Sequence, residues 1–138
     1  MTVSSPAALR ARYVADAVST ASPARLLVML YDKLALDLSH AEDGFRAGDT
    51  ARGRDRAAHA QEIVFELLSS LEVDAWEGGP KLASLYSFLV AELTRAIVEG
   101  DADVIAECRA LVAPLREAWH TASADVAQAA PTRVGGVA

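Results

Sequence analysis

The chain has 138 residues, of which 52% are apolar and 23% are charged, so one domain with an apolar core is expected and disorder throughout is excluded. The net charge of −6 argues against nucleic acid or an anionic membrane surface as the main partner. The longest uncharged apolar run, residues 82–91, has about half of the roughly 20 residues that a membrane-spanning helix needs, so membrane insertion is not expected. Cys108 is the single cysteine, and the sequence does not open on a basic segment followed by an apolar one. These two features predict a protein of the cytosol without a disulfide.

Apolar residues recur at helical spacing in four blocks, at about residues 23–47, 50–72, 80–99 and 102–128. Ser22 followed by Pro23 is typical of a helix start, and Asp101 stands in the capping position before the fourth block. Gly48 and Gly100 are typical of helix ends. Pro114 lies inside the fourth block, where its missing backbone hydrogen bond should bend the helix. No block alternates as a strand would, so the predicted fold class is all-α.

In each block the large apolar residues share one side, which predicts the core. The expected core positions are Leu26, Leu27, Leu30, Tyr31, Leu34, Leu38, Ala41 and Phe45 in the first block; Ala57, Ala60, Ile63, Val64, Leu67, Leu68 and Leu71 in the second; Leu82, Leu85, Tyr86, Leu89, Val90, Leu93, Ala96 and Ile97 in the third; and Val104, Ile105, Cys108, Leu111, Val112, Leu115, Trp119, Ala122 and Val126 in the fourth.

Short links connect the blocks, and such links force neighbouring helices to run antiparallel. The prediction is therefore an antiparallel up-down-up-down four-helix bundle formed by residues 20–128. Residues 1–19 are expected to form a short mobile N-terminal segment, and residues 129–138 a disordered tail.

Three features could suggest catalysis or metal binding, but none has the surroundings that it needs. A carboxylate-bridged di-metal bundle uses two Glu-x-x-His motifs and two further inward glutamates, whereas only Glu117 and His120 have this spacing here. His59 lies in mid-helix, like the histidine of a phosphotransfer domain, but the nearby Glu62 would repel a phosphoryl group. Cys108 lies on the core side of its helix and is expected to be inert. No enzymatic activity, metal or cofactor is predicted.

Subtracting the core leaves several large apolar residues that a lone bundle would expose. Aromatic and methionine side chains in such positions are typical of surfaces that bind partners, here an amphipathic helix or an apolar strand. The candidate contacts are Val28, Met29, Leu36, Phe65 and Phe88. The N-terminal residues that are candidates to cover part of this surface are Leu9, Tyr13, Val14 and Val18.

One combination of motifs extends over most of the chain. Tyr13 and Val18 precede TASP at residues 20–23 and MLYD at residues 29–32, and AQEI at residues 60–63, LY at residues 85–86 and LREAW at residues 115–119 follow. Between about residues 10 and 120 this combination resembles the flagellin-specific export chaperones, the FliS family. The family usually has a glycine after MLYD, where this chain has Lys33.

The resemblance implies a helical bundle that binds the C-terminal segment of flagellin in the cytoplasm. Binding would keep flagellin from polymerising early and help to deliver it to the flagellar type III export gate, which makes a gate component a further candidate partner. Tyr13, Val14 and Val18 would then gate or line the groove. Two alternatives stay open: a self-associating bundle that forms a homodimer without binding flagellin, and a metal-dependent four-helix-bundle oxidase.

Overall fold

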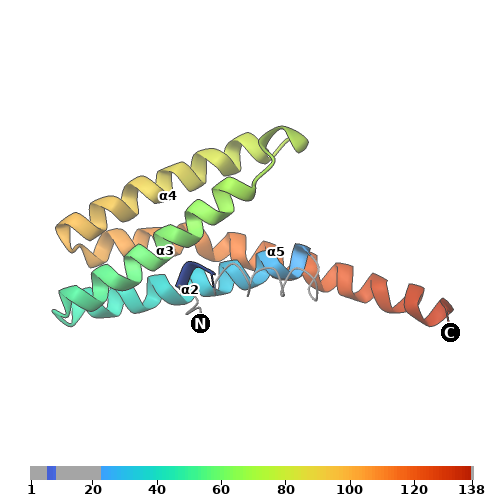
Figure 1. Ribbon diagram of the computed structural model, residues 1–138, viewed down its shortest axis with the longest axis horizontal. Helices are drawn as coiled ribbons and strands as arrows, with labels where there is room; N and C mark the ends of the chain where they lie inside the picture. Colours follow the sequence, from blue (N-terminus) through green and yellow to red (C-terminus); the bar gives the residue numbers. More distant parts are fainter. Residues whose placement is uncertain (1–5, 9–22, 138) are drawn as a thin grey trace, which may run out of the picture. The chain divides into compact units, whose positions relative to one another are not determined.

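The computed structural model describes residues 6–8 and 23–137, with side chains described as far as residue 125. The described part contains the long helices α2 (Pro23–Arg46), α3 (Thr50–Ser70), α4 (Gly79–Glu99) and α5 (Ala102–Val137), and one 3-10 turn, η1 (Val73–Ala75), between α3 and α4 (Figure 1). None of these residues is in a strand. The chain forms two compact units: Leu30–Glu117, and Met1–Met29 together with Ala118–Ala138. The predicted all-α class is confirmed.

The helices begin and end where local sequence chemistry favours it. The Asp49 carboxylate accepts a hydrogen bond from the backbone N–H of Arg52 at 3.1 Å, and so caps α3. Gly48 and Gly100 have φ angles of 79° and 67°, in the left-handed region that glycine adopts without a steric cost. The N–H of Gly100 donates to the carbonyl of Ala96 at 2.7 Å, which ends α4.

Within the unit Leu30–Glu117, polar contacts give the direction of α2 relative to α5. Asp32 pairs with Arg116, whereas Glu42, further along α2, pairs with Arg109, which lies earlier on α5. Residue numbers therefore rise along one helix as they fall along the other, so the two helices run antiparallel.

Contacts between α3 and α4 show the same relation. The Arg54 guanidinium donates to the carbonyl of Ile97 at 3.0 Å, and the Gln61 amide donates to the carbonyl of Val90 at 2.9 Å. These helices are antiparallel as well, and the four together form the predicted up-down-up-down bundle.

The core agrees closely with the predicted stripes. The fully buried apolar residues all fall on predicted core positions; they are Tyr31, Leu34, Leu38, Ala41, Ala57, Ala60, Val64, Leu67, Leu82, Tyr86, Leu89, Leu93, Ala96, Val104, Ile105, Cys108 and Val112. Two predicted core positions are wrong, because Leu111 is 37% exposed and Ala122 is exposed. Leu111 lies roughly 80° from the middle of the buried side of α5, and so at its edge. Ala122 lies beyond Glu117, in the other compact unit.

The C-terminal helix is longer than the sequence predicted. Pro114 is exposed, as expected from its place off the core stripe, and α5 is helical on both sides of it. The helix continues to Val137, past the predicted end near residue 128. The division of the chain at residues 19 and 128 stays a prediction.

One polar pair lies in the core, at the diagonal between α2 and α4. The hydroxyl groups of Tyr31 and Tyr86 are 2.6 Å apart, and both side chains are buried. Burial, together with the Tyr31 hydroxyl, raises the pKa of Tyr86, so this phenol stays protonated. The pair satisfies polar groups that would otherwise lie unpaired in an apolar interior.

Asp37 is a buried charge that joins α2 to α3. Its carboxylate lies 2.9 Å from Nζ of Lys33, 3.6 Å from a guanidinium nitrogen of Arg56 and 4.0 Å from Nδ1 of His59. Among the described residues Oδ2 of Asp37 has no hydrogen-bond partner. Because its side chain is fully buried while those of Lys33 and Arg56 reach solvent, the cations compensate the carboxylate without being buried themselves.

We predict that Tyr31→Phe lowers the free energy of unfolding by about 1–3 kcal/mol, because it leaves the buried Tyr86 hydroxyl without the partner it has in the core. The double variant Tyr31→Phe/Tyr86→Phe should lose less than the sum of the two single variants, since it removes both hydroxyl groups. Urea unfolding of the four proteins measures the coupling. Strictly additive losses would show that the hydroxyl pair is not an energetic unit.

Candidate partner-binding site

Most of the predicted contact residues that the structure describes are exposed. Met29, Leu36, Phe65 and Phe88 are each between 38% and 51% exposed, which confirms the exposure predicted for them. Val28 is only half-buried. Tyr13, Val14 and Val18 lie outside the described residues. A role in partner binding stays a prediction for the whole set.

The exposed residues of the unit Leu30–Glu117 do not form one patch. Leu36 lies about 180° from the middle of the buried side of α2. Phe65 follows Gln61 by one helical turn, on the side of α3 that faces α4. Phe88 lies on the other flank of α4, away from the carbonyl of Val90 that Gln61 contacts. The predicted contacts therefore occupy separate faces of the bundle.

A groove in this unit is lined by residues of α2 and α5. It has a volume of about 420 Å³, and we call it the alanine trough. Its floor consists of small side chains, and its rim carries two arginines. The lining residues are Ala35, Ala106, Arg109, Ala110, Val112, Ala113 and Arg116.

Two ion pairs cross from α2 to α5 along the alanine trough. Toward one end Nε of Arg116 lies 2.7 Å from the Asp32 carboxylate, and toward the other end Arg109 pairs with Glu42. Arg109 and Arg116 are about 10 Å apart along α5, at 1.5 Å per residue. Ala110 and Ala113 lie between them, whereas Ala106 lies about one turn before Arg109, so the arginines stand along the apolar lining of the trough.

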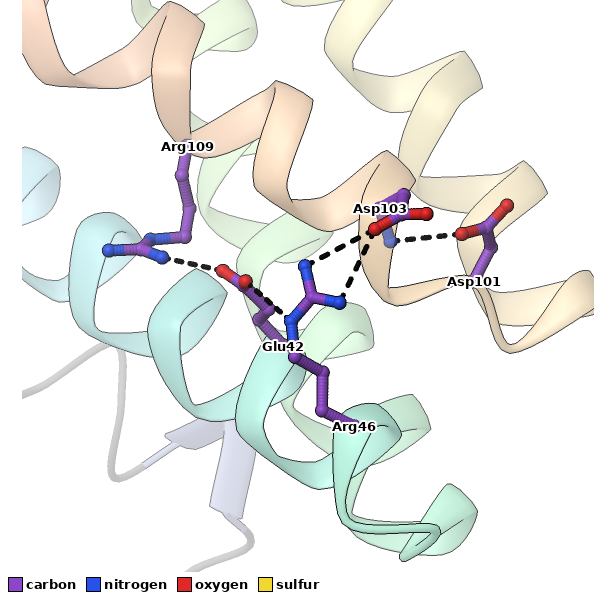
Figure 2. A network of polar contacts seen from close by, with 5 residues as sticks. All are labelled: Glu42, Arg46, Asp101, Asp103 and Arg109. Carbon is purple, nitrogen blue, oxygen red and sulfur yellow. Dashed lines mark hydrogen bonds and ion pairs between the residues drawn. The ribbon is translucent and has the colours of Figure 1, made fainter.

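The pair at the Glu42 end belongs to a larger network (Figure 2). Nε of Arg46 donates to the Glu42 carboxylate at 2.8 Å, and its terminal nitrogens lie 3.3 Å from Asp103 at the start of α5. Asp101 in turn accepts from the backbone N–H of Asp103 at 2.9 Å. Although partial burial alone would raise the pKa of Glu42, hydrogen bonds from Arg109 and Arg46 hold it below its ordinary value. Glu42 therefore stays charged and keeps both arginines in place.

The chemistry of the trough suits binding rather than catalysis. Methyl groups line its floor, and its charged groups are already paired across the helices. Burial raises the pKa of the nearest core thiol, Cys108, to about 11, so it remains a protonated apolar side chain. The described residues contain no group of three histidine, cysteine, aspartate or glutamate side chains that could hold a metal ion. None of the described helices has the length and apolar character needed to cross a membrane.

Sequence reasoning missed the trough because it searched for large apolar residues outside the core. The signal that could have revealed it is the spacing of Ala106, Ala110 and Ala113, which share the side of α5 that faces away from its buried stripe. Small residues on a flank leave room that large residues would fill. Ala35 supplies the matching small residue on α2.

Comparison with known proteins covers most of the chain. The family model described as "Flagellar protein FliS" matches residues 5–126. The flagellar secretion chaperone FliS of Bacillus subtilis is 27% identical over 110 residues, which cover 80% of this chain and 82% of the relative. The protein of the same name from Salmonella typhimurium is 30% identical over 113 residues, which cover 80% of this chain and 83% of the relative.

We predict that the Glu42 network loses its contribution to stability in acid. A carboxyl group whose pKa is lowered on folding stabilises the folded state above its unfolded value, 4.5, and the stabilisation disappears as the pH falls through the folded value. The difference in free energy of unfolding between the wild type and Glu42→Gln should therefore shrink between about pH 5 and pH 3. Glu77→Gln, at an exposed position, is the control and should show no such trend. A difference for Glu42→Gln that is constant over this range would contradict the assignment.

Proposed function

Since the chain belongs to the FliS family of flagellar secretion chaperones, we propose that it binds the C-terminal segment of flagellin in the cytosol. Binding keeps that segment from polymerising early and helps to deliver flagellin to the flagellar type III export apparatus. The proposal assigns the chain no catalytic step. A component of the export gate is a further partner under the same proposal.

The observation that carries the proposal in this chain is the alanine trough. A groove of about 420 Å³ lies within the usual size range of ligand sites, and its small-residue floor lets a partner helix or a bulky apolar side chain approach the backbone closely. Arg109 and Arg116, each nearly half exposed, offer donors to carboxylates at the edges of that partner. An amphipathic segment of flagellin, with an apolar and a polar side, fits this arrangement of an apolar floor and a rim of arginine–carboxylate pairs.

The mechanism that follows is coupled folding and binding. A tail that is disordered when free orders itself on the trough and loses conformational entropy, which apolar burial has to offset. The separate exposed residues Leu36, Phe65 and Phe88 allow a long segment to continue over other faces of the bundle. An ordered, covered tail has no free surface with which to join a growing filament.

We predict that calorimetry detects binding of the flagellin C-terminal segment at micromolar concentration, and that Ala110→Leu raises the dissociation constant tenfold or more. Leucine fills the trough, and tenfold corresponds to about 1.4 kcal/mol. Because Ala110 is exposed and leucine is a good helix former, the variant should fold normally. Ala51→Leu, at an exposed position of α3 away from the trough, is the matched control and should bind like the wild type.

The possible outcomes distinguish whether the chain binds flagellin from where on the chain it binds. No heat and no complex at tens of micromolar would contradict flagellin binding itself. Tight binding that Ala110→Leu leaves unchanged would contradict the trough as its site. Size-exclusion chromatography with light scattering tests the homodimer alternative, since a dimer mass unaffected by the peptide would favour self-association over flagellin binding.

A further inference from the structure

The loop between α3 and α4 presents an aromatic side chain to solvent that the proposed function does not use. Trp76 follows η1 and is 50% exposed, although tryptophan is among the most apolar side chains in the protein. None of the residues that line the alanine trough belongs to this loop. In Figure 1 it is the connection at the ends of α3 and α4.

The Trp76 ring packs against the backbone at Gly78. A Cβ atom on Gly78 would overlap the ring, so one side of the indole lies directly against the backbone there. A Cβ on Gly79 would likewise overlap the carbonyl of Val73, so the loop packs closely onto the start of α4. The N–H of Gly79 also donates to the carbonyl of Trp76 at 3.2 Å. The indole is therefore preorganised, with its uncovered surface toward solvent, and a partner would pay little entropy to order it.

The acidic residues around Trp76 favour a positively charged partner. Glu72, Asp74 and Glu77 flank it in the loop, and all of them are exposed. Within the part of the chain that the structure describes, these three carboxylates form no ion pair, whereas Glu42 and Glu92 are paired with arginines. A cation above an indole face gains from the ring quadrupole, and nearby carboxylates add to that attraction.

We propose that the loop Leu71–Gly78 is a second docking surface, separate from the flagellin site, for a basic segment of a partner protein that places an arginine or lysine side chain on Trp76. Tryptophan and arginine are the residues that most often dominate protein interfaces, and here the chain supplies the tryptophan. The three carboxylates orient the basic segment and exclude acidic partners. The surface binds independently of the trough, so the proposal does not depend on flagellin binding.

The test uses the full chain labelled with 5-fluorotryptophan, which gives separate fluorine NMR signals for Trp76 and Trp119. Trp76→Phe assigns the signals. A peptide of alternating glycine and arginine should shift the Trp76 signal in a saturable way, while a peptide of alternating glycine and glutamate should not. The variant Glu72→Gln/Asp74→Asn/Glu77→Gln should raise the dissociation constant of the arginine peptide at least fivefold.

A matched control removes the same number of charges elsewhere. Asp43→Asn/Glu66→Gln/Glu107→Gln changes exposed acids outside the loop and should bind the arginine peptide as the wild type does. Equal weakening by both triple variants would reduce the effect to net charge and overturn the proposal. A Trp76 signal that the arginine peptide does not move would also overturn it. So would a signal that responds only to phosphatidylcholine vesicles, because the indole would then belong to a lipid-binding surface.

Discussion

The hydrogen bond between the Tyr31 and Tyr86 hydroxyls constrains the rest of the bundle, because two phenols buried in an apolar core have to reach each other across its diagonal. This contact and the buried Leu34, Leu38 and Ala41 share one rotation of α2. With Tyr31 pointing inward, Lys33 and Asp37 fall on the flank that meets α3, while Asp32 and Ala35 fall on the flank that meets α5. The same rotation places one set of α2 residues against α3 and another along the alanine trough.

The trough follows from the different sizes of the side chains on different sides of α5. Its inward positions carry the branched side chains of Val104, Ile105 and Val112, which fill the core. Its outer side carries alanines, which together with Ala35 of α2 line the trough, and arginine–carboxylate pairs cross from α5 to α2 beside them. Surface ion pairs of this kind add little to stability by themselves. Here they flank an apolar space in which Ala110 and Ala113 are exposed.

The parts of this structure that could be predicted depend on hydrophobic period and helix-end chemistry. Proline after serine, glycine at a helix end and one apolar stripe per block are local signals. Every buried apolar residue of the described part falls on a core position that they predicted, although other predicted positions are only half-buried. The trough and the buried Asp37 could not be predicted, because each depends on which helix lies opposite. An alanine on a flank or a charge beside a core stripe has no meaning until its neighbour is known. Leu111 was wrongly predicted to lie in the core because helical period alone does not show which residues at the edge of an apolar stripe are covered by a neighbouring helix.

The central claim is that the alanine trough holds the flagellin C-terminal segment, and methyl NMR of the alanine-labelled chain tests it most directly. On adding the segment, the methyl signals of Ala35, Ala106, Ala110 and Ala113 should move in a saturable way. Those of the buried Ala57 and Ala60 on α3 should stay in place, because core packing does not change. Movement confined to alanines outside the trough, with the four trough signals unaffected at saturation, would contradict the account.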